Sequence, residues 1–175
     1  EEEGFLPCTP AAVLFCMLYY GIETQGKHIV ILGRSNVVGK PLANILLWKR
    51  NFANATVTVC HSKTNNLAEF TKEADILITA IGKAEFVTPE MVRENAIILD
   101  VGINEIKLAN GESNYVGDVN YKLCYDKALA ITPVPGGIGR ITTSVLFLNL
   151  VDACLKSRNT NKSIDEYIHL IFDGK

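Results

Sequence analysis

The sequence lacks the features that mark several common functional classes. Its 17 basic and 19 acidic residues give a net charge of -2, and no basic cluster carries interleaved aromatic residues, so we expect no nucleic acid partner. No apolar run reaches the length of a membrane span and no signal or transit peptide is visible, so we expect no membrane partner and a cytoplasmic protein. Internal repeats and low-complexity segments are also missing.

The cysteines form no recognisable framework. They are odd in number and widely scattered, with no C-x-x-C pair and no histidine at metal-ligand spacing: Cys8, Cys16, Cys60, Cys124 and Cys154. Neither a disulfide framework nor a zinc site is therefore predicted, and reduced thiols are expected. With 175 residues, 48% hydrophobic and 21% charged, the composition instead fits one soluble domain that buries a core.

Residues 28–47 are the stretch around which the remaining chain is organised. A continuous apolar run of strand length (28–32) leads into a loop containing Gly33 and Gly39, and apolar residues at helical spacing begin at Leu42. Strand, tight loop and helix in this order open a βαβ unit. The backbone N–H groups and the helix dipole at such a loop suit a phosphate or pyrophosphate.

The spacing inside this loop leaves two interpretations open. Gly33 and Gly39 stand six residues apart, with Ser35 between them, whereas the dinucleotide fingerprint G-x-G-x-x-G is shorter and has a middle glycine. Lys40 is followed by Pro41, so the Ser or Thr that completes a P-loop is missing. The loop either binds a nucleotide or is a strand-to-helix turn in which two glycines allow close packing.

Apolar strands alternate with helices along the rest of the chain. We predict helices at 11–20, 67–73, 89–95, 121–129 and 142–156, strands at 55–60, 75–82 and 96–102, a short strand from 130, and a hairpin-like excursion at 103–117. This order predicts an α/β fold with a Rossmann-like, doubly wound, mostly parallel sheet and helices on both faces. Gly33, Ser62, Gly82 and Gly102 fall at carboxyl ends of strands, where ligands gather, and this convergence favours the nucleotide interpretation.

The end of the second strand indicates which nucleotide is bound. A Rossmann domain that binds NAD normally places an acidic residue there, on the ribose 2′-hydroxyl. This chain instead has Ser62 and Lys63 there, and Arg34 in the first loop. That set would neutralise a 2′-phosphate and favours NADP, with a solvated polar turn as the alternative. His61 is interpreted as an exposed, hydrogen-bonding residue.

Two proline-containing segments flank this arrangement. Residues 7–10 (PCTP) begin the first helix, with Thr9 as the expected N-cap, and Cys8 is interpreted as a packed rather than a reactive thiol. Residues 133–139 hold two prolines and three glycines. This second loop either approaches a flat ligand closely or forms a rigid turn.

Six motifs follow one another along the chain: PCTP at 7–10, GRSNVVGKP at 33–41, CHSKT at 60–64, DVGIN at 100–104, GDV at 117–119 and PVPGGIG at 133–139. In this order, over residues 5–156, the chain resembles the bifunctional methylenetetrahydrofolate dehydrogenase/methenyltetrahydrofolate cyclohydrolase family. The resemblance implies an enzyme, usually a homodimer, that acts on tetrahydrofolate one-carbon derivatives. It would oxidise 5,10-methylenetetrahydrofolate by hydride transfer to NADP and hydrolyse the methenyl product to 10-formyltetrahydrofolate.

The resemblance also implies a division into domains. Residues 1–157 would form the NADP-binding Rossmann-like domain, led by a helix within 1–21 from the interdomain region, and the N-terminal folate-binding, catalytic domain would lie outside this chain. Residues 158–175 are predicted to form a polar linker and an amphipathic helix, because Ser163 and Glu166 make a capping box ahead of an apolar stripe.

By the same resemblance, residues of this chain are assigned to ligands. The residues that would bind the cofactor are Gly33, Arg34, Ser35, Ser62, Ile103, Thr9, Gly82 and Thr142. The residues that would border the folate are Pro135, Gly136 and Gly137. Cys8 would lie near the nicotinamide, beside Thr9.

The chain departs from the family pattern in ways that concern the chemistry. Ala12 stands where the family usually has glycine, and Arg140-Ile141 stand where it usually has Pro-Met. None of the six tyrosines is followed four residues later by lysine, so the family's catalytic Tyr-x-x-x-Lys pair is missing and no catalytic residue is assigned. The alternative to an enzyme domain is a cofactor-binding module without catalysis, regulatory or degenerate.

Overall fold

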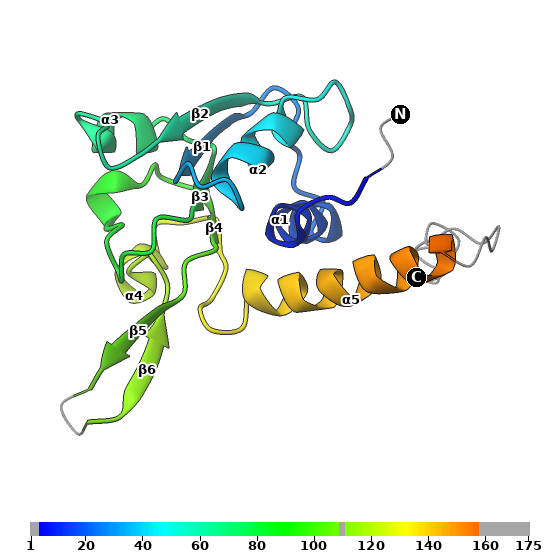
Figure 1. Ribbon diagram of the computed structural model, residues 1–175. Helices are drawn as coiled ribbons and strands as arrows, with labels where there is room; N and C mark the ends of the chain where they lie inside the picture. Colours follow the sequence, from blue (N-terminus) through cyan, green and yellow to red (C-terminus); the bar gives the residue numbers. More distant parts are fainter. Residues whose placement is uncertain (1–3, 109–110, 158–175) are drawn as a thin grey trace.

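The computed structural model of the chain describes residues 4–108 and 111–157. A five-stranded parallel sheet lies at its centre, in the order β2-β1-β3-β4-β7; β1, β2, β3 and β4 are labelled in Figure 1. Its strands are β1 (His28–Leu32), β2 (Thr56–Cys60), β3 (Ile76–Thr79), β4 (Ile97–Asp100) and β7 (Ala130–Ile131). This arrangement confirms the predicted α/β, Rossmann-like fold.

Two apolar cores lie on opposite faces of the sheet. Ile29 and Ile31 of β1 pack into one core and Val30 and Leu32 into the other, because successive side chains of a strand point to opposite faces. The helices of the first core are α1 (Cys8–Tyr19), α2 (Gly39–Leu46) and α5 (Ile138–Ser157), and those of the second are α3 (Leu67–Thr71), the 3₁₀ turn η1 (Pro89–Met91) and α4 (Tyr121–Cys124). The sheet is therefore covered on both sides, as predicted.

Several predicted helices have different bounds in the structure. The helix expected at 89–95 is only the turn η1, because Val92 is extended with φ -112° and ψ 137° and Asn95 has φ 60°. The first helix starts at Cys8 with Pro7 as its N-cap, so Thr9 lies in the first turn and is not the cap. α4 and α3 are shorter than expected, and α5 starts four residues earlier, directly after the glycine loop.

A two-stranded antiparallel hairpin projects from the sheet. It consists of β5 (Asn104–Lys107) and β6 (Ser113–Val116) and points away from the body of the molecule in Figure 1. This confirms the predicted excursion at 103–117. The base of the hairpin lies close to the carboxyl end of β4, since Asn104 follows Asp100 by four residues.

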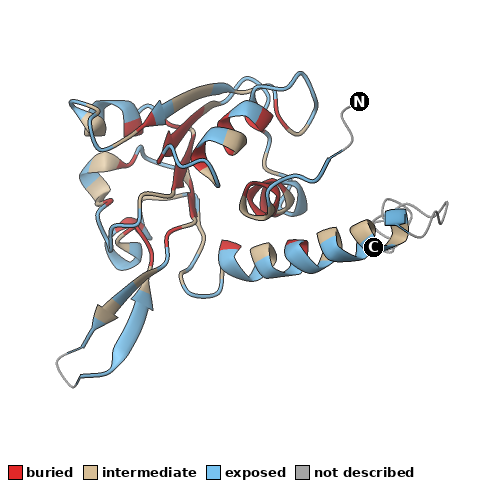
Figure 2. Ribbon diagram, in the orientation of Figure 1, coloured by how far each residue is buried: buried red, intermediate tan, exposed pale blue. Residues whose placement is uncertain are grey.

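α5 is an apolar helix that is largely uncovered. It contacts α1, but its outer face is exposed in Figure 2, and its exposed large side chains include Leu146, Phe147, Leu150 and Val151. By length and composition alone, this 20-residue helix could cross a membrane. In contrast, no apolar run of that length was predicted from the sequence. The linker and helix predicted at 158–175 lie outside the described residues.

Candidate functional site

Two glycines allow the loop between β1 and α2 to pack tightly. Gly33 has φ 129°, and a Cβ on it would lie 2.3 Å from the carbonyl oxygen of Ala80 at the end of β3. A Cβ on Gly39, the first residue of α2, would lie 2.0 Å from the carbonyl oxygen of Gly33. The close-packing interpretation of these glycines therefore holds, and it also leaves the strand ends open to a ligand.

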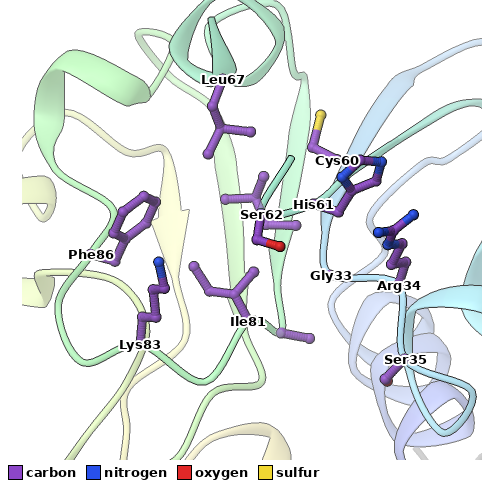
Figure 3. Close-up of a pocket in the computed structure, with 12 residues that line it drawn as sticks. Gly33, Arg34, Ser35, Cys60, His61, Ser62, Leu67, Ile81, Lys83 and Phe86 are labelled. Atoms are coloured by element: carbon purple, nitrogen blue, oxygen red, sulfur yellow. The ribbon is translucent and has the colours of Figure 1, made fainter. Parts of the chain in front are cut away.

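A cavity of about 260 Å³ opens beside this loop, at the carboxyl ends of β1, β2 and β3. We call it the Arg34 cavity. It is lined by Leu32, Gly33, Arg34, Ser35, Cys60, His61, Ser62, Leu67, Ala80, Ile81, Lys83 and Phe86. In Figure 3, Arg34 and His61 lie on one side, Lys83 and Phe86 on the other, and Ser62 between them.

The charge in this cavity has one sign. None of the described residues that line it is acidic, whereas Arg34 and Lys83 are cations. The ammonium of Lys83 lies 5.0 Å from the ring centroid of Phe86, in cation–π geometry. Lys63, which was predicted to act with Ser62, does not line the cavity, and its backbone N–H donates to Nδ1 of His61 at 3.1 Å. The arrangement suits an anionic group beside a flat one.

Lys83 and Phe86 were not identified from the sequence as site residues. The one signal that pointed toward them was Gly82, placed at the end of a predicted strand. The structure puts Gly82 itself at φ 68° and outside the lining of the cavity. Because this positive φ turns the chain, the side chain of the next residue, Lys83, lines the cavity. A predicted strand that ends at Gly82 does not specify such a turn.

A second cavity, of about 280 Å³, lies at the carboxyl ends of β4 and β7. We call it the Pro135 cavity. It is lined by Asp100, Val101, Gly102, Ile103, Pro133, Val134, Pro135, Gly136, Gly137, Gly139, Arg140 and Thr143. Gly136 has φ 111°, and a Cβ on Gly137 would lie 2.5 Å from the carbonyl oxygen of Pro133, so this loop requires glycine at both positions.

The structure divides the predicted site residues into three sets. Gly33, Arg34, Ser35 and Ser62 line the first cavity, and Ile103, Pro135, Gly136 and Gly137 line the second. Gly82, Thr9 and Thr142 line neither cavity. Thr142 lies on α5 with its hydroxyl donating to the carbonyl of Ile138 at 3.1 Å, and its neighbour Thr143 faces the second cavity. The assignment of these three residues to the cofactor stays a prediction.

Two buried carboxylates lie close to these cavities: Asp100 lines the Pro135 cavity, and Asp118 lines neither. Asp100 is 3% exposed and accepts hydrogen bonds from the hydroxyl of Thr79 at 2.9 Å and from the backbone N–H groups of Gly102, Asp118 and Val119. Burial raises the pKa of the Asp100 carboxyl, against the lowering effect of these hydrogen bonds. Asp118 is fully buried and accepts only from N–H donors among the described residues. Both carboxylates hold loops together and neither lies free as an acid or base.

Comparisons with known proteins agree with this geometry. The model of the family described as tetrahydrofolate dehydrogenase/cyclohydrolase, NAD(P)-binding domain, matches residues 7–158. The chain is 53% identical over 150 residues to the bifunctional protein FolD of Chloroherpeton thalassium, covering 85% of this chain and 51% of that protein. It is 51% identical over 157 residues to the bifunctional protein FolD of Dehalococcoides mccartyi, covering 89% of this chain and 53% of that protein.

Solved structures show the same likeness. The bifunctional enzyme FolD from Campylobacter jejuni matches with a TM-score of 0.79 at 44% identity, over 90% of this chain and 52% of that one. The Trypanosoma brucei enzyme, solved with NADP cofactor and an inhibitor, matches with a TM-score of 0.79 at 35% identity, over 88% of this chain and 52% of that one. This chain thus spans about half the length of the relatives it matches. It belongs to the tetrahydrofolate dehydrogenase/cyclohydrolase family and corresponds to the NAD(P)-binding domain of that family.

Proposed function

We propose that this chain is the NADP-binding domain of an enzyme that oxidises 5,10-methylenetetrahydrofolate and hydrolyses the product to 10-formyltetrahydrofolate. The observation that carries the choice of cofactor is the Arg34 cavity, which has two cations and no acidic residue among its described lining residues. An acidic residue at this place would repel a 2′-phosphate. A relative of this chain was solved with NADP, which supports the same choice.

The residues present fit this cofactor. Arg34 and Ser62 would hold the 2′-phosphate on the adenosine side, since a guanidinium and a hydroxyl donate hydrogen bonds to phosphate oxygens. Gly33 lines the cavity at the end of β1, where the diphosphate would cross. Ile103 and the loop at 135–137 would border the nicotinamide and the folate. When bound, NADP supplies the hydride acceptor of the oxidation.

The share of this chain in the reaction is binding and orientation. Hydride transfer depends mainly on holding donor and acceptor close together in the correct geometry. The hydrolysis needs an acid or base, but Asp100 and Asp118 are both engaged by hydrogen bonds from the protein, and the sequence has no Tyr-x-x-x-Lys pair. We therefore place the acid–base groups of the hydrolysis outside this chain.

Calorimetric titration of this chain with NADP and NAD tests the cofactor assignment. NADP should bind at least about tenfold more tightly than NAD, because a charge-assisted hydrogen bond contributes about 1.5–3 kcal/mol. Arg34→Ala and Ser62→Ala should each reduce the NADP affinity and leave the NAD affinity nearly unchanged. Lys63→Ala is the matched control, since Lys63 adjoins Ser62 but does not line the cavity. Equal affinity for the two nucleotides, or binding of neither, would contradict the proposal.

A further inference from the structure

The carboxylate of Asp118 fills a pocket formed by the turn after β3. Its Oδ2 accepts the backbone N–H of Ile81 at 2.7 Å and that of Gly82 at 3.2 Å, and its Oδ1 accepts the N–H of Lys83 at 2.9 Å. Successive backbone N–H groups that converge in this way form a binding site for an anion. Here a side chain 35 or more residues further along the chain supplies the anion.

The same carboxylate is tied to the base of the hairpin. The side-chain amide of Asn104 donates to its Oδ1 at 2.9 Å, and a Cβ on Gly102 would lie 2.3 Å from its Cγ. Gly102 lines the Pro135 cavity, whereas Ile81 and Lys83 line the Arg34 cavity. Asp118 therefore lies between the turn that borders one cavity and the segment that borders the other.

The turn at 81–83 depends on the Asp118 carboxylate more than the segment that follows the turn does. Gly82 and Lys83 are exposed, whereas the following segment has backbone anchors of its own, from the N–H of Glu85 to the carbonyl of Gly117 at 3.0 Å and from the N–H of Val87 to the carbonyl of Asp118 at 2.9 Å. Loss of the carboxylate would therefore release the turn and keep those later anchors.

We propose that Asp118 is a positioning residue for the cofactor, acting through the three backbone N–H groups of residues 81–83. By fixing this turn before the ligand arrives, it places Ile81 and Lys83 in the wall of the Arg34 cavity, and a preformed wall lowers the ordering cost of binding. The inference rests on the proposed function, because the ligand is the adenosine half of NADP.

The test compares three proteins by calorimetry with adenosine 2′,5′-bisphosphate, which carries only that half of the cofactor. In Asp118→Asn the amide has one acceptor oxygen and turns an N–H₂ toward backbone N–H donors, so the affinity should fall about tenfold or more. Thr79→Val is the control, because it removes a hydrogen bond from the same buried network, to Asp100 at 2.9 Å, and Thr79 lines neither cavity. Its affinity should stay within about twofold of wild type when both variants are folded.

A double variant and amide exchange separate positioning from general destabilisation. If Asp118 acts through the wall, Lys83→Met should lower the affinity of the wild-type chain but add little in the Asp118→Asn background. Amide hydrogen exchange of residues 81–83 in the ligand-free wild-type chain should be slow, and this measurement does not require the variant to fold. Fast exchange there, wild-type affinity in Asp118→Asn, or an equal loss in Thr79→Val would each overturn the inference. If the wild-type chain binds neither NADP nor the bisphosphate, the proposed function itself fails and the inference with it.

Discussion

The carbonyl oxygen of Gly33 occupies the space in which a side chain of Gly39 would begin, because a Cβ on Gly39 would lie 2.0 Å from that oxygen and 2.6 Å from its carbon. Both contacts are with backbone, which moves only if the turn between β1 and α2 opens. This contact joins the first residue of α2 to Gly33, which lines the Arg34 cavity.

Gly39→Ala should therefore both destabilise the chain and abolish nucleotide binding. Overpacking of this kind costs about 1–3 kcal/mol, measured as a shift in the urea midpoint, and calorimetry should show no NADP binding. For the urea midpoint alone, Gly139→Ala is the matched control, because this glycine also lies in the first turn of a helix but its Cβ would meet only the tip of Ile103 at 3.3 Å. An unchanged urea midpoint in Gly39→Ala would show that the turn opens without cost.

The fold could be predicted from the sequence where a continuous run of apolar residues indicates a buried strand. β1, β3 and β4 are short continuous apolar runs, which parallel strands buried on both faces require, and each was predicted within a few residues. The cofactor assignment of Thr142 rests on a motif and stays a prediction. The residue of this pair that lines the Pro135 cavity is its neighbour Thr143.

The parts of the site that were not predicted depend on contacts between distant segments. Asp118 meets the N–H of Lys83 across 35 positions of the chain, and no local pattern reveals that pairing. The helix expected at 89–95 ends after one turn because Val92 turns into the second core, where it is 1% exposed. In both cases tertiary packing decided a conformation that local sequence left open.

Lys83→Met should weaken NADP binding without unfolding the chain. The substitution keeps an unbranched side chain over Phe86 but removes the ammonium that lies 5.0 Å from the ring centroid. An exposed charge of this kind contributes about 0.5–1 kcal/mol, so calorimetry at low ionic strength should show about a two- to fivefold loss. Lys63→Met makes the same change of charge outside the cavity and should have a smaller effect. Equal losses in the two variants would mean that only net charge matters.

The stability of the chain should depend on Asp75 at acidic pH. The backbone N–H of His28 donates to its Oδ2 at 2.9 Å, and this bond is the largest cause that lowers the pKa of Asp75 below its ordinary 3.8, with the nearby Arg93 guanidinium adding to it. The unfolded chain binds this proton more tightly than the folded one. The carboxylate therefore stabilises the fold above about pH 4, and the stabilisation is lost as the pH falls through the folded-state pKa.

Urea denaturation from neutral to acidic pH measures this effect. Asp75→Asn should be less stable than wild type by about 1 kcal/mol at neutral pH, and the difference should shrink as the pH falls. Arg93→Met should keep most of the pH dependence, because it leaves the hydrogen bond from His28 in place. A constant difference between wild type and Asp75→Asn across the whole range would contradict the assignment.

Arg140 supplies a cation to the Pro135 cavity. It lies in the first turn of α5 and is exposed, and among the described residues its guanidinium has no hydrogen-bond or ion-pair partner. A free guanidinium beside a cavity attracts anionic ligands, and the attraction weakens once salt reduces the screening length to about 10 Å or less.

Arg140→Ala should therefore leave the urea midpoint nearly unchanged and reduce NADP affinity about two- to fivefold at low ionic strength. At high ionic strength the NADP affinities of the variant and the wild type should converge, because salt screens the attraction between the Arg140 guanidinium and the anionic ligand. Arg50→Ala is the matched control, because Arg50 contacts Trp48 after α2 and lines neither cavity. If Arg140→Ala and Arg50→Ala lose affinity equally, the cation acts through net charge alone. If the loss persists at high ionic strength, Arg140 contacts the ligand directly and its effect is a short-range hydrogen bond.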